Sequence, residues 1–224
     1  MNLEEYKKHK LDQANKAQAI DDYHRKKCFT CYRSVTNCLC KNMKPFDTKV
    51  HFVILMHIKE AKKEKVGTGR LAAGCIKNSR IIVGIDFSEN TQVKSLLEDP
   101  KYFPMILYPG EDAYNISEEC VSKFEIPSGK TPLVFVIDGT WPCAKKMMRE
   151  SKNLHDLPRI CFSPSKKSLF SIKQQPHDFC LSTIESIHFL LDEMDRVGID
   201  SLDNKHDNLL EIFKEMVDYQ VMCA

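Results

Sequence analysis

The sequence has no long apolar run. Nothing in its 224 residues approaches the roughly 18 to 20 consecutive apolar positions that a membrane-spanning helix requires. Residues 1–18 are charged and have no apolar centre, so they do not resemble a secretory signal peptide. Both absences argue against the membrane and secreted classes, and we expect a cytoplasmic protein.

The sequence also lacks an internal repeat and the common nucleotide-binding fingerprints. The glycine turn at 67–70 opens a predicted helix that runs to Cys75, but it matches neither the Walker pattern nor the dinucleotide pattern. Because the first backbone N–H groups of a helix are free, such a turn can still bind a carboxylate or a phosphate.

Cysteine is too sparse for a secreted disulfide scaffold, since 10 residues make up only about 4% of the chain. Four of them, Cys28, Cys31, Cys38 and Cys40, fall within a stretch of thirteen residues. Close thiols in a reducing compartment predict a metal site. We expect structural zinc, with an iron–sulfur cluster on the same ligands, or disulfides, as the alternatives.

The length favours one large domain with a small appendage, and 42% apolar residues can build a core. Residues 3–25 contain neither Gly nor Pro and favour a helix. We expect this helix and the cysteine cluster to form one segment over residues 1–45, and residues 46–224 to form the main domain.

The net charge of +2 conceals an uneven distribution. Residues 1–80 contain 18 Lys and Arg against 8 Asp and Glu, and residues 141–180 contain 8 against 3. Basic stretches of this kind suit a protein that places one face on a polyanion, although solvated surfaces give the same pattern.

Apolar runs rich in β-branched residues alternate with helical segments, which favours an α/β fold. Strands are predicted at 50–56, 81–86, 105–108, 133–138 and 159–162, and helices at 91–97, 142–151, 182–194 and 209–217. Residues 61–65 are expected to form a lysine-rich loop.

The strand predicted at 133–138 ends on Asp138, and the chain turns at Gly139 into a helix near Trp141. In α/β proteins, ligands usually bind beyond the carboxyl ends of the strands. Asp138, Thr140 and the only tryptophan are therefore expected at the position of a typical active site. The structural alternative is that Asp138 caps the helix and Trp141 fills the core, and at this point both interpretations stay open.

A second polar corner follows the strand at 50–56. His57 and Glu60 could form a catalytic pair there, but a partly exposed His after a strand is more often a surface or capping residue. The basic loop at 163–176 can grip RNA or can be plain surface.

Six stretches, in order along the chain, resemble one family, the DTW-domain proteins. The family is named for an Asp-x-Thr-Trp signature, which stands here as Asp138-Gly139-Thr140-Trp141. The other five are the cysteine cluster, the corner from His57 to Glu60, Thr68-Gly69-Arg70-Leu71, Pro109-Gly110-Glu111-Asp112-Ala113 and Ser182-Thr183-Ile184-Glu185. Agreement in order at six places is more specific than any single motif.

The resemblance implies a tRNA-uridine aminocarboxypropyltransferase. Such an enzyme transfers the 3-amino-3-carboxypropyl group of S-adenosylmethionine to N3 of a tRNA uridine and releases 5′-methylthioadenosine. The family is similar to SPOUT-type methyltransferases, which implies a mostly parallel sheet flanked by helices and a carboxyl-terminal trefoil knot. We expect tRNA as the partner of a monomer, with a dimer as the alternative.

The resemblance also implies roles for individual residues. The expected catalytic residues are Asp138, Thr140 and Trp141, with Asp138 either the base for the imide proton or only a group that orients the uracil. The expected cofactor-binding residues are Thr68, Gly69, Arg70, Pro109, Gly110, Glu111, Ile137, Gly139 and Glu185. The expected RNA-binding residues are Lys62, Lys63, Lys65, Lys145, Lys146, Arg149, Lys166, Lys167 and Lys173.

The chain departs from the family pattern in two places. The usual His-Pro-x-Glu is here His57-Ile58-Lys59-Glu60, and an Arg common in the basic loop is here Lys173. Neither change removes an obvious catalytic group. Two other functions are weighed against the transferase: an S-adenosylmethionine-dependent RNA methyltransferase of similar fold, and a non-catalytic zinc-containing RNA-binding module.

Overall fold

The computed structural model describes residues 8, 11–13, 15–16, 26–63, 67–118, 125–164, 167–170 and 180–223. Contacts divide the chain into two compact units, Met1–Lys41 and Asn42–Ala224, which are taken separately below. Of the helix predicted at 3–25, the six described residues are helical. Among the residues that the structure describes, no helix is long and apolar enough to cross a membrane.

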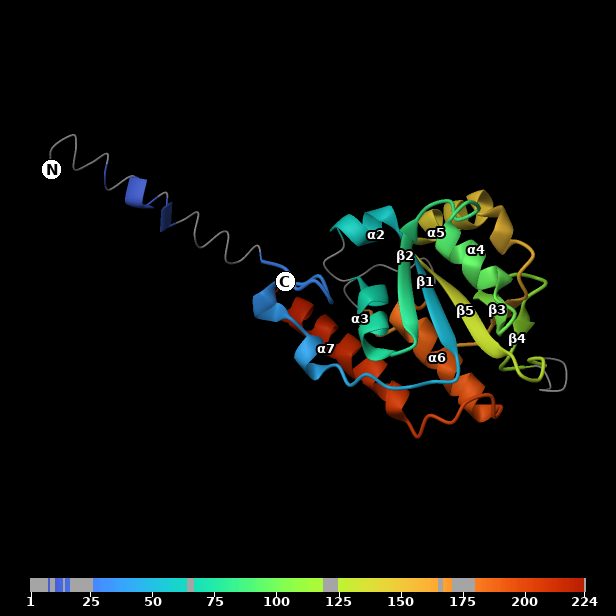
Figure 1. The fold of residues 1–224 in the computed structure, drawn as a ribbon. Helices are drawn as coiled ribbons and strands as arrows, with labels where there is room; N and C mark the ends of the chain where they lie inside the picture. The colour runs from blue at the N-terminus through green and yellow to red at the C-terminus, as the bar shows by residue number, and fades with distance from the viewer. Residues whose placement is uncertain are drawn as a thin grey trace. The chain divides into compact units, whose positions relative to one another are not determined.

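The larger unit is built on a six-stranded sheet in the order β2-β1-β5-β3-β6-β4 (Figure 1). The strands are β1 (His51–His57), β2 (Ser79–Gly84), β3 (Tyr102–Leu107), β4 (Tyr114–Asn115), β5 (Thr131–Asp138) and β6 (Arg159–Cys161). Every pairing between neighbours in this sheet is parallel. The predicted α/β class and the mostly parallel sheet are confirmed.

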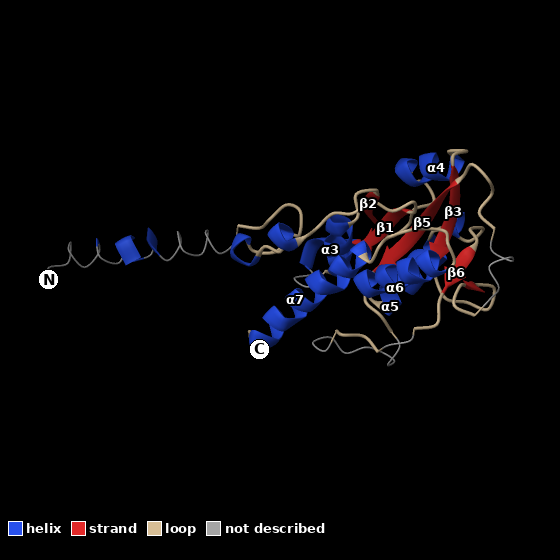
Figure 2. Ribbon diagram, turned by 90° about the horizontal axis from the view of Figure 1, so that it is seen from below, coloured by secondary structure: helices blue, strands red, loops and turns tan. Residues whose placement is uncertain are grey.

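Helices cover both faces of the sheet (Figure 2). On one face, α4 (Thr91–Glu98) and α5 (Trp141–Glu150) pack against alternate strand residues such as Val53, Leu55 and Phe135. On the other face lie α3 (Thr68–Cys75), α6 (Thr183–Arg196) and α7 (Asn208–Met222), which also pack against one another. Because side chains alternate across a strand, β1 and β5 contribute apolar residues to both layers.

Strand β5 lies at the centre of the sheet, between β1 and β3. Six of its eight residues are buried, as expected for a parallel strand covered on both faces. In the register, Met56 of β1 pairs with Asp138, so the signature carboxylate terminates a central, largely buried strand.

Two local predictions were wrong. Of the lysine-rich loop predicted at 61–65, residues 61–63 belong instead to helix α2 (Ile58–Lys63). Strand β4 was not predicted, since two residues cannot establish an alternating pattern. It pairs with β6 at the edge of the sheet.

Candidate functional site

The carboxyl ends of four neighbouring strands lie at one edge of the sheet. Strands β1, β5, β3 and β6 end at His57, Asp138, Leu107 and Cys161, and all four run in the same direction. Polar and aromatic groups that follow these strands are therefore brought together although they are far apart in sequence. The candidate site is at this edge.

Asp138 is buried, with 5% of its surface exposed, and it contacts helix α6. Thr183 Oγ1, in the first turn of α6, donates a hydrogen bond of 2.6 Å to Asp138 Oδ1. The N-cap position of helix α5 is occupied by Thr140 and not by Asp138, and Thr140 is exposed. The interpretation of Asp138 as a simple helix cap is therefore wrong.

Helix α3 packs its first turn against the same carboxylate. A Cβ atom added at Gly69 would lie 2.5 Å from Asp138 Oδ2, closer than atoms can approach. Glycine is required here for close contact between the helix and the aspartate. The first turn of α3, the end of a helix that carries partial positive charge, therefore lies close to the Asp138 carboxylate.

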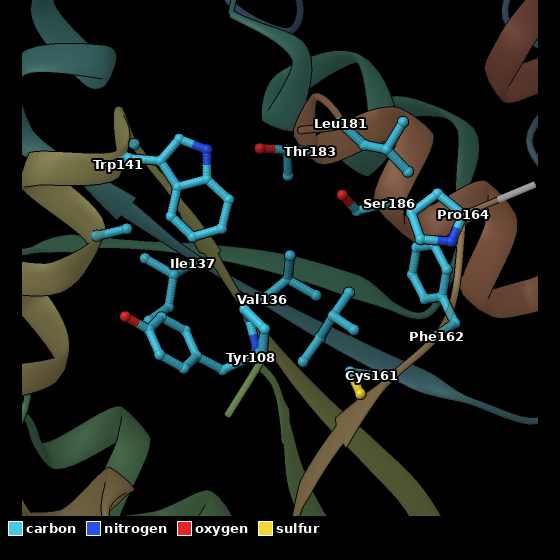
Figure 3. A pocket seen from close by; sticks show the side chains of 14 residues that line it. Tyr108, Val136, Ile137, Trp141, Cys161, Phe162, Pro164, Leu181, Thr183 and Ser186 are labelled. Atoms are coloured by element: carbon cyan, nitrogen blue, oxygen red, sulfur yellow. The ribbon is translucent and has the colours of Figure 1, made fainter. Parts of the chain in front are cut away.

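A pocket of about 280 Å³ opens beside this corner, close to the lower end of the usual range for small-molecule sites, about 300 to 1,000 Å³. It is lined from β3, β5 and β6 and from the start of α6 (Figure 3). Its wall comprises Leu107, Tyr108, Pro109, Val136, Ile137, Gly139, Trp141, Ala144, Cys161, Phe162, Pro164, Leu181, Thr183 and Ser186. Aromatic and aliphatic groups predominate, with few polar groups, as is usual in pockets that bind small molecules.

Trp141 forms one side of this pocket and is only half-buried, so it does not fill the core. The hydroxyl groups of Thr183 and Ser186 lie on the side facing the indole (Figure 3). Because Thr183 donates its proton to Asp138, its oxygen can only accept a hydrogen bond from a molecule in the pocket. Thr183 therefore connects the buried carboxylate to the cavity.

The structure brings four of the twelve predicted catalytic and cofactor residues to the pocket wall: Pro109, Ile137, Gly139 and Trp141. Asp138 and Gly69 lie directly behind it. Thr140, Gly110 and Glu111 are exposed and do not line it. Thr68 is buried in α3, and Arg70 donates to the Ala61 carbonyl at 3.4 Å.

Glu185 is buried, with 1% exposed, and its carboxylate is engaged within the protein. It accepts hydrogen bonds from Ser182 N and Oγ, from Ser168 Oγ and from Leu169 N. The predicted capping box at the start of α6 is present. With four donors already bound, Glu185 fits a structural role better than the predicted contact with a cofactor.

His57 is 4% exposed, so the expectation of a surface residue was wrong, although the expected capping contact exists. Its Nδ1 accepts from the backbone N–H of Lys59 at 3.2 Å, which places the proton of the neutral ring on Nε2. Burial, followed by the nearby charges of Lys59 and Lys146, lowers the pKa of His57. A Cβ added at Gly139 would lie 3.4 Å from His57 Cβ, so His57 packs closely against the signature turn.

The predicted RNA-binding residues fall on more than one element. Lys62 is exposed on α2, and Lys145, Lys146 and Arg149 are exposed on α5. Lys167 is exposed in the segment before α6. The side chain of Lys63, and Lys65, Lys166 and Lys173, lie outside the described part of the chain.

The smaller unit gathers the four clustered cysteines. Cys28 Sγ lies 3.5 Å from Cys40 Sγ, Cys31 Sγ lies 3.8 Å from Cys38 Sγ, and all four sulfur atoms lie within 4.8 Å of one another. With Zn–S bonds of about 2.3 Å, a tetrahedral site needs sulfur–sulfur distances of about 3.8 Å. The thiols are free, so the geometry fits a metal site with four cysteine ligands and not two disulfides.

Local backbone structure shapes this cluster. Cys28 and Tyr32 are joined by a 2.8 Å backbone hydrogen bond, and Tyr32 has a left-handed φ of 61°, which folds the Cys28–Cys31 segment into a tight turn. The backbone N–H of Cys31 lowers the pKa of Cys28 to about 6, whereas burial raises the pKa of Cys40. A thiolate is the form that binds a metal.

Comparison with known proteins gives a consistent assignment. The model of the DTW domain matches residues 25–221. Proteins named tRNA-uridine aminocarboxypropyltransferase 2 from Macaca fascicularis and Mus musculus are 30% and 31% identical to the chain over 72% of its length, which corresponds to 54% of theirs. The protein of that name from Drosophila melanogaster is 30% identical, over 72% of this chain and 64% of its own.

The chain thus spans a little over half the length of the first two curated relatives. No solved structure matches it. The family model covers more than half of the chain, including the cysteine cluster, the signature at 138–141 and helix α6. The chain therefore belongs to the DTW-domain family.

Proposed function

We propose that this protein is a tRNA-uridine aminocarboxypropyltransferase, which transfers the 3-amino-3-carboxypropyl group of S-adenosylmethionine to N3 of a tRNA uridine. Membership of the DTW family and the names of three relatives support the activity. The observation that carries the proposal is the buried Asp138, coupled through Thr183 to an apolar pocket.

S-adenosylmethionine supplies a methylene carbon activated by its sulfonium. In the transfer, a bond forms between that carbon and N3 of the uracil, the carbon–sulfur bond breaks, and 5′-methylthioadenosine leaves. The N3 proton must be removed. We assign its path to Thr183 Oγ1, which accepts the proton while passing its own to Asp138, so that the carboxylate ends protonated.

The remaining residues of the corner position the reactants. Trp141 offers a ring face for the uracil or the adenine, and Tyr108 and Phe162 complete the aromatic wall. Gly69 holds Asp138 by close packing. Because the geometry of attack is critical, a proton acceptor that is held in one place favours the reaction.

The tRNA would lie across the exposed basic residues at the carboxyl edge. The charges of Lys59 on α2 and Lys146 on α5 both lower the pKa of His57, which packs against the signature turn. Both lysines are therefore near this turn. Lys62, Lys145 and Arg149 extend this charge along the same two helices. Phosphate contacts position a nucleic acid and make its binding dependent on salt.

The cysteine cluster would hold a structural Zn²⁺, which the sulfur spacing supports. We assign the main domain, residues 46–224, to a SPOUT-like fold with a carboxyl-terminal trefoil knot, by analogy with the wider family. A tRNA substrate implies a cytoplasmic enzyme.

The test is mass spectrometry of nucleosides and small molecules after incubation with S-adenosylmethionine and unmodified tRNA. The proposal predicts a uridine heavier by one aminocarboxypropyl group, together with methylthioadenosine. Asp138→Asn should lose both products, while Asp156→Asn, an exposed aspartate beyond α5, should retain them.

Two results would overturn the proposal. A methylated nucleoside with adenosylhomocysteine would assign the protein to the methyltransferases. Binding of tRNA without any product, over a set of unmodified tRNAs that together offer uridine at every loop position, would leave a binding module.

A further inference from the structure

A second cluster of metal-binding side chains lies in the larger unit. His188 is on α6, Asp192 follows one helical turn later, and His206 is in a short 3-10 turn, Lys205–Asp207, just before α7. One ligand atom from each of the three residues lies within 4.8 Å of the others. We propose that this cluster binds a divalent transition metal of the zinc class, as a second metal site that joins α6 to the start of α7.

The two histidines are unusually enclosed for polar groups. His188 is 3% exposed and His206 is 1% exposed, and their rings lie 4.9 Å apart between centroids. Nδ1 of each ring is buried without a hydrogen-bond partner among the described residues. A buried nitrogen without a partner is costly, and at His188 coordination of a metal through Nδ1 would use its lone pair.

Asp207 fixes the orientation of His188. Its Oδ1 accepts from His188 Nε2 at 3.0 Å, so in the neutral ring the proton is on Nε2 and the lone pair is on Nδ1. That Nδ1 lies 3.5 Å from Asp192 Oδ2. A carboxylate that holds the far nitrogen of a ligating histidine is the usual second-layer support of a metal site.

The distances suit a tetrahedral ion. With bonds of about 2.0 to 2.2 Å, neighbouring ligand atoms lie about 3.4 Å apart, close to the separation of His188 Nδ1 and Asp192 Oδ2. His206 Nε2 lies 2.6 Å from Asp192 Oδ1, where a proton now joins the two groups. A metal would replace this proton and increase the separation.

The cluster has access to solvent on one side only. Asp192 is exposed, with 47% of its side chain accessible, while the two rings face inward. Two histidines and one carboxylate from the chain leave a fourth position for water. The ligands of this site differ chemically from those of the cysteine cluster, because they are nitrogen and oxygen atoms and not sulfur atoms.

The experiment uses the full chain, stripped of metal and reconstituted with Zn²⁺, with metal per chain measured by mass spectrometry. Wild type should hold two equivalents, and Asp192→Asn should hold one. Asp203→Asn is the matched control, an exposed aspartate in the same connection that should keep two; Asn tolerates its left-handed φ of 50°. His206→Gln should also hold one, which guards against a folding effect peculiar to Asp192→Asn.

Co²⁺ substitution separates the two sites. The difference spectrum between wild type and Asp192→Asn should contain only ligand-field bands, without the thiolate-to-cobalt charge transfer that a cysteine site gives. A wild-type protein with one equivalent, or variants that keep two, would overturn the proposal, and so would a difference spectrum with charge-transfer character.

Discussion

Asp138 and Glu185 are both buried carboxylates in the DTW motifs, but their surroundings differ. Glu185 accepts four hydrogen bonds from the start of α6 and the segment at 168–169. Asp138 is bonded to Thr183, a residue that also lines the pocket. Burial alone does not distinguish a structural acid from a reactive one. The distinction comes from whether the hydrogen-bond partners end inside the protein or continue to a cavity.

The largest effect is expected at Asp138. Asp138→Asn keeps the shape but removes the proton acceptor, so activity should fall at least about 100-fold. The melting temperature should change little, because the amide can still bond to Thr183. Single-turnover transfer and a thermal melt measure the two quantities. If Asp138→Asn lowered the melting temperature and left the transfer rate unchanged, Asp138 would have a structural role like that of Glu185.

Glu185→Gln should show the opposite pattern. An amide cannot accept four hydrogen bonds, so we expect a loss of about 2 to 3 kcal/mol in the free energy of unfolding, or roughly 5 to 10 °C. Denaturant unfolding measures this loss, and the folded fraction should keep most of its activity below the melting point. Glu193→Gln is the control, since its surface pair with Arg196 on the same helix is worth little.

Substitution of Thr183, the hydrogen-bond partner of Asp138, should give an intermediate effect. Thr183→Val removes the hydroxyl and should reduce the transfer rate about 10- to 100-fold, equivalent to roughly 1.4 to 2.7 kcal/mol of transition-state stabilisation. Thr183→Ser keeps the hydroxyl and should retain most of the rate. A loss of rate in Thr183→Ser together with a retained rate in Thr183→Val, which keeps the methyl group, would show that the methyl contact, and not the proton path, is what matters.

Gly69→Ala should give the smallest effect. The added methyl must displace the Asp138 carboxylate, at a cost of about 1 to 2 kcal/mol in stability. Transfer should weaken together with stability, because the displaced group is Asp138. Gly198→Ala is the comparison, since nothing lies within 4 Å of its added Cβ but its φ of 80° is strained. Gly198→Ala should therefore destabilise the fold without a specific loss of rate.

Much of the fold could be predicted from local patterns. Continuous apolar runs identified β1, β2, β3, β5 and β6, because a parallel strand buried on both faces shows no alternation. The capping box identified the start of α6. The order of strands could not be read in the same way, because pairing across the sheet depends on contacts between distant residues.

The site was predicted less completely, for the same reason. The signature at 138–141 was correctly placed at the end of a strand. Thr183 and Ser186 were missed as parts of the pocket, because Thr183 meets Asp138 from 45 residues further along the chain. The motif at 182–185 was recognised, but a cofactor contact was predicted for its carboxylate, Glu185, and none for the hydroxyl of Thr183.

The central position of β5 has a consequence for how the chain folds during synthesis. Strands β1 and β3 are made first, yet they do not pair with each other, because β5 lies between them. Until residues 131–138 have emerged, the sheet consists of separate pieces with exposed apolar edges. Contacts that span so much sequence form slowly. Slow insertion of β5 predicts that shortened chains ending before Asp138 aggregate, and that chaperones bind nascent chains of that length.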